Sequence, residues 1–367
     1  MSYLTRVDAA LQKIHDSGRY RELPTHQLTG VIDFSSNDYL ALSTNAQVLQ
    51  AFRHATRAGS GGSRLLGGRH REFSLLEEEL AAWLGRERAL LFSSGYHAAL
   101  GVIPVLARTV KTIYSDALNH ASIIDGIRLS RADRSIYPHA ALPPRAERNG
   151  PSLIVTESIF SMDGDAVDLD AMLRDLGDDD VLLVDDAHAL GVVGAQGTGM
   201  AAALKDPRVI VLGTLSKGFG VHGGFVAGPA ALIELLVNEA RTFIFDSALP
   251  PAIALAARVA LVQIRNGDEA RKRLHENIAR TRAGVASLGI PIIDSRAPIV
   301  PVVLGSESRA MNVSAALLEK QRLYVPAIRP PTVPQGSSRL RLSLRSDHIA
   351  EQIDLLIEGL RECIAIL

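Results

Sequence analysis

Two stretches of the sequence place reactive side chains directly after apolar residues. "VLLVDDAHALG" (181–191) leads into Asp185 and then His188, and "GTLSKGFG" (213–220) brings Lys217 amid glycines. An amine can attack a carbonyl carbon, a carboxylate can hold a proton on a ring nitrogen, and an imidazole can donate or accept a hydrogen bond. The plainer alternatives are a polar loop and a solvated surface lysine, and neither stretch alone decides between the interpretations.

Short apolar runs alternate with helix-length segments through the middle of the chain. Runs that are apolar on both faces predict a largely parallel sheet with helices on both sides. A further strand at 223–229 follows its predecessor too closely for a helical crossover, so we expect it to be antiparallel. The expected parallel strands are 88–94, 112–116, 152–158, 181–186 and 209–214.

The carboxyl ends of parallel strands meet at one edge of a sheet. Asp185, Lys217 and the residues after Ser94 are therefore expected to lie together. The stretch "SGYHAA" (94–99) can begin a helix, and the exposed N–H groups of a helix start suit a phosphate.

Pyridoxal phosphate is the one cofactor that requires all of these groups. It forms a Schiff base with a lysine, here Lys217, and needs an acidic partner such as Asp185 on its pyridine nitrogen. His188 is expected at the phenolic oxygen and His120 over the ring face. The alternative for His120 is a polar residue at a helix start, where Asn119 or Ser122 could equally be the cap.

A basic strand near the C-terminus is the other candidate feature. In "SSRLRLSLR" (337–345), Arg339, Arg341 and Arg345 share one face of an alternating strand. The pattern alone favours a solvated edge strand. The functional interpretation is that Arg341 clamps a substrate carboxylate with two hydrogen bonds.

Two other motifs do not support a site. "GFGVHGG" (218–224) contains the glycine spacing of a dinucleotide-binding loop, but a strand rather than a helix is expected after it. "DGDAVDLD" (163–170) lacks the glycine at the sixth position and the distal glutamate of a calcium loop. Asp168 is expected to cap a helix instead. The sequence has no zinc-ligand spacing, so we expect no metal.

Composition narrows the class of protein. The 367 residues have a formal net charge of −1, so neither nucleic acid nor a membrane surface is expected as a partner. No secretory signal is evident, and the single cysteine, Cys363, fits a reducing compartment, so a cytoplasmic location is expected. We expect three regions: a helix with a small strand element at 1–45, an α/β domain at 46–285 and an α+β domain at 286–367.

The chain resembles the α-oxoamine synthases, which are fold-type I pyridoxal-phosphate enzymes. The likeness covers nearly the whole chain, and it implies a major domain built on a mostly parallel sheet, a smaller α+β C-terminal domain, and a homodimer with shared active sites. The stretches that carry it are "FSSNDYLALS", "GSGGSRLLGG", "LFSSGYHAA", "NHASIIDGIRLS", "IFSMDGD", "VDDAHALG", "LSKGFGVHGG" and "AIRPPTVPQGSSRLRLSL".

The resemblance also implies roles for individual residues. Lys217 would hold the cofactor covalently and, with His120, act as the acid–base group. The implied cofactor-binding residues are Gly95, Tyr96, His120, Ser161, Asp185, His188, Thr214 and Lys217. The implied substrate-binding residues are Arg21, Asn37, Thr332 and Arg341.

The implied reaction joins L-alanine to a pimeloyl thioester with loss of CO2, a step of biotin synthesis. The acyl carrier would be coenzyme A or an acyl-carrier protein, and the sequence favours neither. A sister synthase that uses glycine, serine or another acyl donor is the nearest alternative. A catalytically silent structural paralogue is a different class of alternative, and the presence of Lys217 argues against it.

Overall fold

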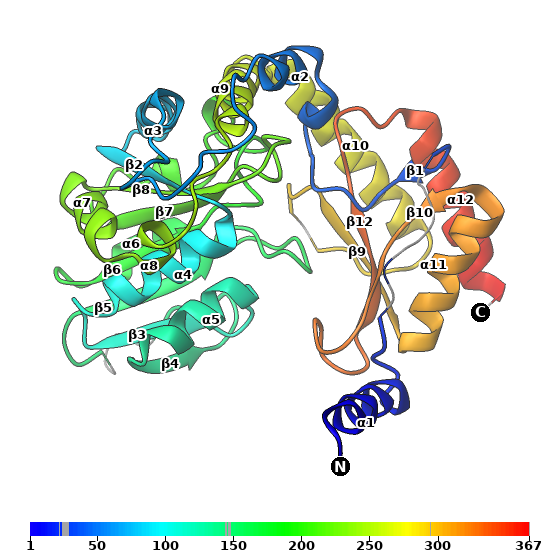
Figure 1. The fold of residues 1–367 in the computed structure, drawn as a ribbon. Helices are drawn as coiled ribbons and strands as arrows, with labels where there is room; N and C mark the ends of the chain where they lie inside the picture. The colour runs from blue at the N-terminus through cyan, green and yellow to red at the C-terminus, as the bar shows by residue number, and fades with distance from the viewer. Residues whose placement is uncertain (22, 24–28, 144, 146–147, 294, 367) are drawn as a thin grey trace. The chain divides into compact units, whose positions relative to one another are not determined.

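The structure is a computed structural model that describes residues 1–21, 23, 29–143, 145, 148–293 and 295–366 (Figure 1). The chain forms two compact units, each assembled from separate segments. One unit contains 1–35, 302–342 and 355–367, and the other contains 36–301 and 343–354. The three regions expected from the sequence stay a prediction. In the described part of the chain, no helix is long and apolar enough to cross a membrane.

The larger unit is built on a mixed seven-stranded sheet. Six strands share one direction, and β8 is antiparallel to both of its neighbours, as expected for 223–229. Parallel strands need long crossover connections, usually helical. Helices lie in the connections that follow the strands ending at Phe92, Asp116 and Glu157, whereas the connection 186–208 contains only short 3₁₀ turns. Across the sheet the strands are β2 (Arg88–Phe92), β8 (Gly224–Gly228), β7 (Val209–Thr214), β6 (Val181–Asp185), β5 (Ser152–Glu157), β3 (Thr112–Asp116) and β4 (Asp133–Tyr137) (Figure 1).

The larger unit also contains helices, several of which pack on the sheet. Those of the larger unit are α2 (Ala46–Arg53), α3 (Arg71–Leu84), α4 (Gly95–Leu106), α5 (Ala121–Ser130), α6 (Leu169–Asp175), α7 (Ala230–Glu239), α8 (Arg241–Ile244), α9 (Pro251–Arg265) and α10 (Asp268–Ser287). Short 3₁₀ turns lie at Leu42–Thr44, Ala195–Gly197 and Ala201–Ala203. Asp168 caps α6 by accepting a hydrogen bond from the N–H of Ala171 at 2.8 Å, as its sequence position predicts.

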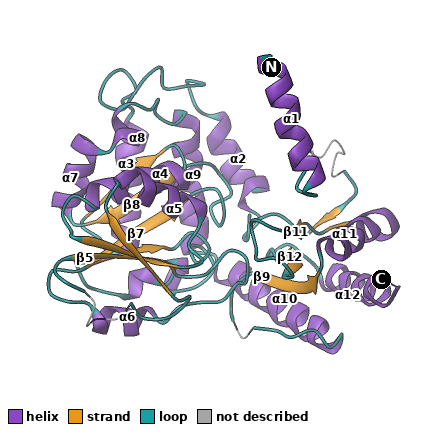
Figure 2. Cartoon of the chain, turned by 90° about the horizontal axis from the view of Figure 1, so that it is seen from below, coloured by secondary structure: helices purple, strands orange, loops and turns teal. Residues whose placement is uncertain are grey.

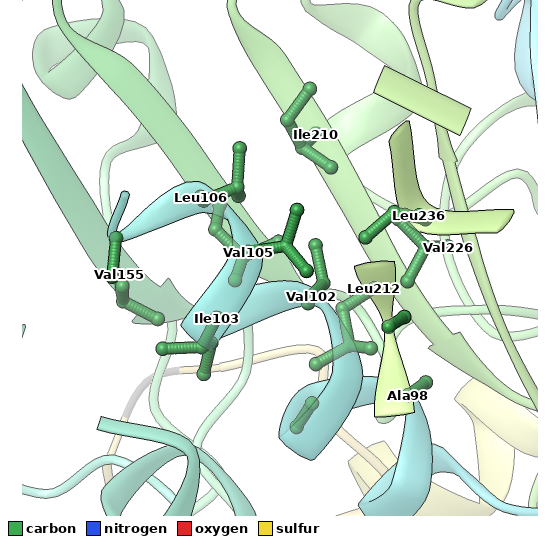
Figure 3. Packing of buried hydrophobic residues seen from close by; sticks show 14 of the residues in the cluster. Ala98, Val102, Ile103, Val105, Leu106, Val155, Ile210, Leu212, Val226 and Leu236 are labelled. Atoms are coloured by element: carbon green, nitrogen blue, oxygen red, sulfur yellow. The ribbon is translucent and has the colours of Figure 1, made fainter. Parts of the chain in front are cut away.

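The core of the larger unit lies between α4 and the central strands. Figure 3 shows side chains of α4 beside those of the strands, among them Val102, Ile103, Val155, Ile210 and Leu212. All five are at most 2% exposed. Burial of each such side chain contributes about 1.5–3 kcal/mol to stability. The central strands are buried on both faces, which explains their unbroken apolar runs.

Strand β4 is the element that the sequence pattern did not predict. Asp133, Arg134 and Ile136 are exposed there, and only Tyr137 is fully buried. The strand is the last in the order of the sheet, so one side of its backbone pairs with no strand among the described residues. Its charged residues are typical of a protected edge and resemble a loop in sequence.

The smaller unit combines helices with short strands. Strand β1 (Ile32–Asp33) pairs in parallel with β10 (Leu323–Tyr324), so the N-terminal segment completes a sheet with residues far along the chain. A second sheet has the order β11 (Ala327–Ile328), β12 (Ser338–Ser343), β9 (Ile299–Gly305), with β12 in the middle (Figure 2). The helices of this part are α1 (Tyr3–Asp16), α11 (Glu307–Gln321) and α12 (Ala350–Ile366).

Gly101 in α4 tests how tightly the core of the larger unit is packed. A Cβ placed there would lie 2.6 Å from Oγ1 of Thr242 and 2.9 Å from Cε1 of Phe92. Helix propensity alone favours alanine by about 1 kcal/mol, whereas overpacking costs about 1–3 kcal/mol. We expect Gly101→Ala to lower the free energy of unfolding, measured by urea denaturation. A variant more stable than the parent would show that the space is not filled.

Candidate active site

A pocket of about 240 Å³ opens at the carboxyl edge of the seven-stranded sheet. Its volume is just below the roughly 300–1,000 Å³ of drug-sized sites, as suits a one-ring ligand. Its lining comes from the ends of β5, β6 and β7 and from the starts of α4 and α5. The lining residues are Ser94, Gly95, Tyr96, His120, Ser122, Glu157, Asp185, Ala187, Leu212, Gly213, Thr214, Ser216 and Lys217.

Lys217 lies in the tight turn that follows β7. The N–H of Leu215 bonds to the carbonyl of Gly223, which closes the turn before β8 returns. The next residue must be small, because a Cβ on Gly218 would lie 2.3 Å from the carbonyl oxygen of Leu190. The glycines beside the lysine therefore allow the turn to press against the loop after β6, which brings Lys217 and His188 together.

His188 links the lysine to the interior. Its Nε2 lies 2.8 Å from Nζ of Lys217, and its Nδ1 lies 2.6 Å from the hydroxyl of Tyr39. Tyr39 is fully buried and His188 is only 3% exposed. Tyr39 was not predicted as a site residue, because 149 residues separate it from His188 and no local pattern links them.

The two carboxylates at the end of β6, Asp185 and Asp186, have different tasks. Asp185 lines the pocket, as expected. Asp186 points away from solvent and accepts hydrogen bonds from the N–H groups of Met200 and Ala201 at 3.3 and 3.1 Å. Burial raises the pKa of Asp186 to about 6, and these hydrogen bonds oppose the rise. The second carboxylate therefore holds the 200–201 turn, and only the first is available to a ligand.

The start of α4 forms the anion-binding end of the pocket. Ser94 caps the helix by accepting a hydrogen bond from the N–H of His97 at 3.1 Å, and Gly95 begins the helix. A Cβ on Gly224 would lie 2.3 Å from the backbone nitrogen of Gly95, so only glycine lets β8 approach here. Thr214 lies close by, because its Cβ is 3.2 Å from the position that a Cβ on Gly95 would take. N–H groups and a hydroxyl at a helix start suit a phosphate.

His120 is both a helix cap and a lining residue. Its Nδ1 accepts a hydrogen bond from the N–H of Ser122, which makes His120 itself the N-cap of α5. Its ring lies edge-on to that of Tyr96, with 6.4 Å between the ring centroids. Burial lowers the pKa of His120; Asp185 opposes this effect and Lys217 reinforces it. The neutral imidazole is thus favoured, as suits a group that stacks on a ring or accepts a proton.

Glu157 is a lining residue that the sequence analysis missed. It ends β5 and lies directly opposite Asp185 on β6. Its Oε1 is buried and makes no hydrogen bond. Burial, reinforced by the charge of Asp185, raises the pKa of Glu157 well above its ordinary value. The rule that identified Asp185, a carboxylate at the end of an apolar strand, would also have identified Glu157 in "SLIVTE" (152–157).

Not every predicted site residue lines the pocket. Ser161 lies in the turn after β5 and is not among the lining residues. Asn37 lies in the larger unit, where its Oδ1 accepts a hydrogen bond from Tyr39. Arg21 and Thr332 lie in the smaller unit and line a groove of about 720 Å³ there. Their approach to the lysine stays a prediction.

Arg341 also belongs to the smaller unit. The sequence pattern favoured a solvated edge strand, and that interpretation is wrong. Strand β12 is the middle strand of its sheet, and Arg339 and Arg341 are each only 5% exposed. Charged side chains are rarely buried to this degree unless they are paired. The burial is compatible with a clamp for a carboxylate.

The pocket fits pyridoxal phosphate. A primary amine, an acid beside a ring-sized space, an imidazole for a ring face and a helix start for a phosphate all line it. The unpaired Oε1 of Glu157 shows that its polar surface is not saturated by the protein itself. In the described residues, no cluster of three histidine, cysteine or acidic side chains could hold a metal ion.

The chain belongs to the aminotransferase class I and II family, whose model matches residues 29–360. Among the curated relatives is an 8-amino-7-oxononanoate synthase from Methylococcus capsulatus, 46% identical over 91% of this chain and 89% of that protein. Further relatives of the same name are 43–44% identical. The family resemblance seen in the sequence is thereby confirmed.

Solved structures confirm the fold. An 8-amino-7-oxononanoate synthase from Francisella tularensis has a TM-score of 0.81 at 30% identity, over 92% of this chain and 99% of that one. A structure of SPT (serine palmitoyltransferase) with its PLP internal aldimine has a TM-score of 0.90 at 28% identity, and both chains are covered in full. The chain thus has the fold expected for the fold-type I class.

Glu157 offers a test of the electrostatics of this pocket. A carboxyl whose folded-state pKa is raised makes the fold less stable as pH rises above its unfolded pKa, about 4.3. Glutamine keeps the shape and removes the titration. In the cofactor-free chain we expect Glu157→Gln to gain stability over the parent as pH increases from about 5 to about 8. Urea denaturation at both pH values measures the difference in the free energy of unfolding between Glu157→Gln and the parent. A difference that becomes smaller as pH rises would contradict the raised pKa of Glu157.

Proposed function

We propose that this chain joins L-alanine to a pimeloyl thioester and releases 8-amino-7-oxononanoate, CO2 and the free carrier thiol, with pyridoxal phosphate as cofactor. The observation that carries the proposal is the set of relatives of that name at 43–46% identity, matched over about nine-tenths of their length. The pocket supports it, because its groups are those that this cofactor requires. The product is an intermediate of biotin synthesis.

The chain's own residues have distinct tasks in this proposal. When bound, pyridoxal phosphate would supply an electron-withdrawing protonated ring for the substrate's α-carbon. Asp185 would keep a proton on the ring nitrogen, and the start of α4, with Gly95, Tyr96 and Thr214, would hold the phosphate end. Ser161 is proposed as a further cofactor contact from the resemblance alone.

Proton transfer is assigned to Lys217. Its Nζ, freed when the amino acid takes its place, would remove the proton from the α-carbon and later return one to the product. His188 lies 2.8 Å from that nitrogen and would face the cofactor's phenolic oxygen. His120 would cover the ring, and its favoured neutral form does not oppose the protonated ring.

The substrate side is assigned from the resemblance. Arg341 would bind the carboxylate of alanine until it leaves as CO2, and Asn37 would line the same side. Arg21 and Thr332 would contact the acyl donor, and their shared groove, lined by both apolar and basic side chains, suits a chain that ends in a carboxylate. We also propose a homodimer with shared active sites and a cytoplasmic location.

A sister synthase is the second candidate. SPT has the higher TM-score of the two solved structures described above, so the fold does not separate the synthases. Sequence identity does separate them, because the curated relatives of 43–46% identity exceed the 28% of SPT. The alanine and pimeloyl donor are therefore preferred.

A substrate matrix tests the proposed function. The full-length chain with PLP is given alanine, glycine or serine, each with pimeloyl-CoA, pimeloyl acyl-carrier protein or palmitoyl-CoA, and products are measured by mass spectrometry. A pocket discriminates one methyl group by about 10–200-fold, so kcat/KM for alanine is expected to exceed that for glycine by at least tenfold. Faster turnover of serine with palmitoyl-CoA would overturn the choice of substrates.

A further inference from the structure

Three segments of the larger unit meet at His139, a residue that does not line the pocket. It follows β4, and its Nδ1 lies 2.9 Å from Oδ1 of Asp116, which ends β3. Its Nε2 lies 2.7 Å from Oδ2 of Asp165, in the turn after β5. Its ring lies edge-on to that of the buried Phe160, with 4.4 Å between the ring centroids. One imidazole thus joins the ends of three neighbouring strands.

Both segments joined by this imidazole carry a proposed cofactor contact. Asp116 begins the stretch that ends at His120, which lines the pocket. The N–H of Phe160 donates to the carbonyl of Asp165 at 2.9 Å, which closes the turn that contains Ser161. A shift of either carboxylate is therefore passed on to a residue that is proposed to meet the cofactor.

The hydrogen bonds of this bridge require a proton on the ring. Both oxygens of Asp116 accept from backbone N–H groups, Oδ1 from Leu118 at 2.8 Å and Oδ2 from Ala140 at 2.9 Å. These donors favour the ionised carboxylate, to which Nδ1 of His139 then donates. A neutral ring would point its remaining lone pair from Nε2 at the carboxylate of Asp165. The bridge is therefore complete when the ring is an imidazolium.

The surrounding charges favour this form. Burial lowers the pKa of His139, but the hydrogen bonds and charges of Asp116 and Asp165 outweigh this effect and raise it overall. The side chain of Asp116 is fully buried and that of Asp165 largely so, which limits screening by salt. Burial raises the pKa values of Tyr137 and Glu157, and the charge of Asp116 adds to both effects. Among these five groups, the cation is His139.

Backbone strain marks the same junction. Ala140, directly after the histidine, has a φ of +55°, in the left-handed region that residues other than glycine rarely adopt. Strain of this kind persists where the surrounding contacts hold it. The N–H of Ala140 and the ring of His139 both bond to the carboxylate of Asp116. That carboxylate is thus gripped by two adjacent residues of one strained turn.

We infer that His139, as an imidazolium, is a positioning residue that holds the segment ending at His120 and the turn with Ser161 in place for the cofactor. Loss of the ring proton would break the bond to Asp165 and release the turn. The histidine acts through the residues that it positions and touches no reacting atom. The inference deepens the proposed function and rests on it for the cofactor.

A purely structural tie, in which the charge does not matter, is the alternative. Asp165→Asn and Asp165→Ala are matched variants that separate the two. The amide of asparagine can donate to a neutral Nε2, so the bridge survives without the ring charge. Alanine removes the bridge at any pH.

The first measurement is ¹⁵N-histidine NMR of the full-length chain without PLP, as a function of pH. The His139 signal is identified by its loss in His139→Gln, and circular dichroism verifies folding of each variant. In the parent we expect both ring nitrogens to be protonated at pH 7 and the ring to titrate above its ordinary pKa of about 6.5. In Asp165→Asn we expect titration at a lower pH than in the parent.

The second measurement is the Kd of PLP, from the absorbance of the bound cofactor, at pH 7 and at one unit above the NMR midpoint of the parent. Contacts away from a ligand change its affinity by about two- to thirtyfold. Asp165→Ala is expected to weaken binding by such a factor at pH 7 and by less at the higher pH, where the parent has also lost the bridge. Asp165→Asn is expected to bind more tightly than Asp165→Ala at pH 7, and more tightly than the parent at the higher pH.

Two results would overturn the inference. One is titration of His139 in the parent at or below its ordinary pKa of about 6.5, which requires no variant to fold. The other is the same PLP affinity in folded Asp165→Asn and Asp165→Ala. If both measurements give the expected results and the substrate matrix yields no 8-amino-7-oxononanoate, the proposed function fails and the role of His139 stands.

Discussion

The contact between Nζ of Lys217 and Nε2 of His188, at 2.8 Å, is the interaction on which the rest of the site depends. It forms because two strands of the same direction end at the same edge of the sheet. The turn after β7 carries the amine, Asp185 ends β6, and the loop after β6 carries the imidazole. Because residues 218 and 224 are glycines, the turn after β7 can approach the loop after β6, and β8 can approach the start of α4. A side chain at either position would clash with the neighbouring backbone.

Burial then determines the charges around this contact. Two carboxyl groups, Glu157 and Asp185, end neighbouring strands directly opposite each other. Burial, reinforced by the charge of Asp185, raises the pKa of Glu157 well above its ordinary value, which favours the protonated form of that group. Asp185, the more exposed of the two, lines the pocket. His120 is favoured as neutral for the same reason, since burial opposes a second positive charge beside Lys217.

Much of this arrangement could be predicted from the sequence, because it follows from local rules. Apolar runs gave the positions of the strands, and a short connection indicated that β8 is antiparallel. The strand-end rule brought Lys217, Asp185 and the start of α4 together. The pairing of Tyr39 with His188 could not be predicted, because no local pattern records a contact across 149 residues. The burial of Arg341 was misjudged for a similar reason, since alternation does not tell a middle strand from an edge strand.

Covalent attachment of the cofactor at one lysine is the central claim, and chemical trapping tests it most directly. The full-length chain is mixed with pyridoxal phosphate, reduced with borohydride, digested and mapped by mass spectrometry. The account predicts a phosphopyridoxyl group on the peptide that contains Lys217 and on no other in stoichiometric amount. Stoichiometric labelling of another lysine, or none at all, would contradict it.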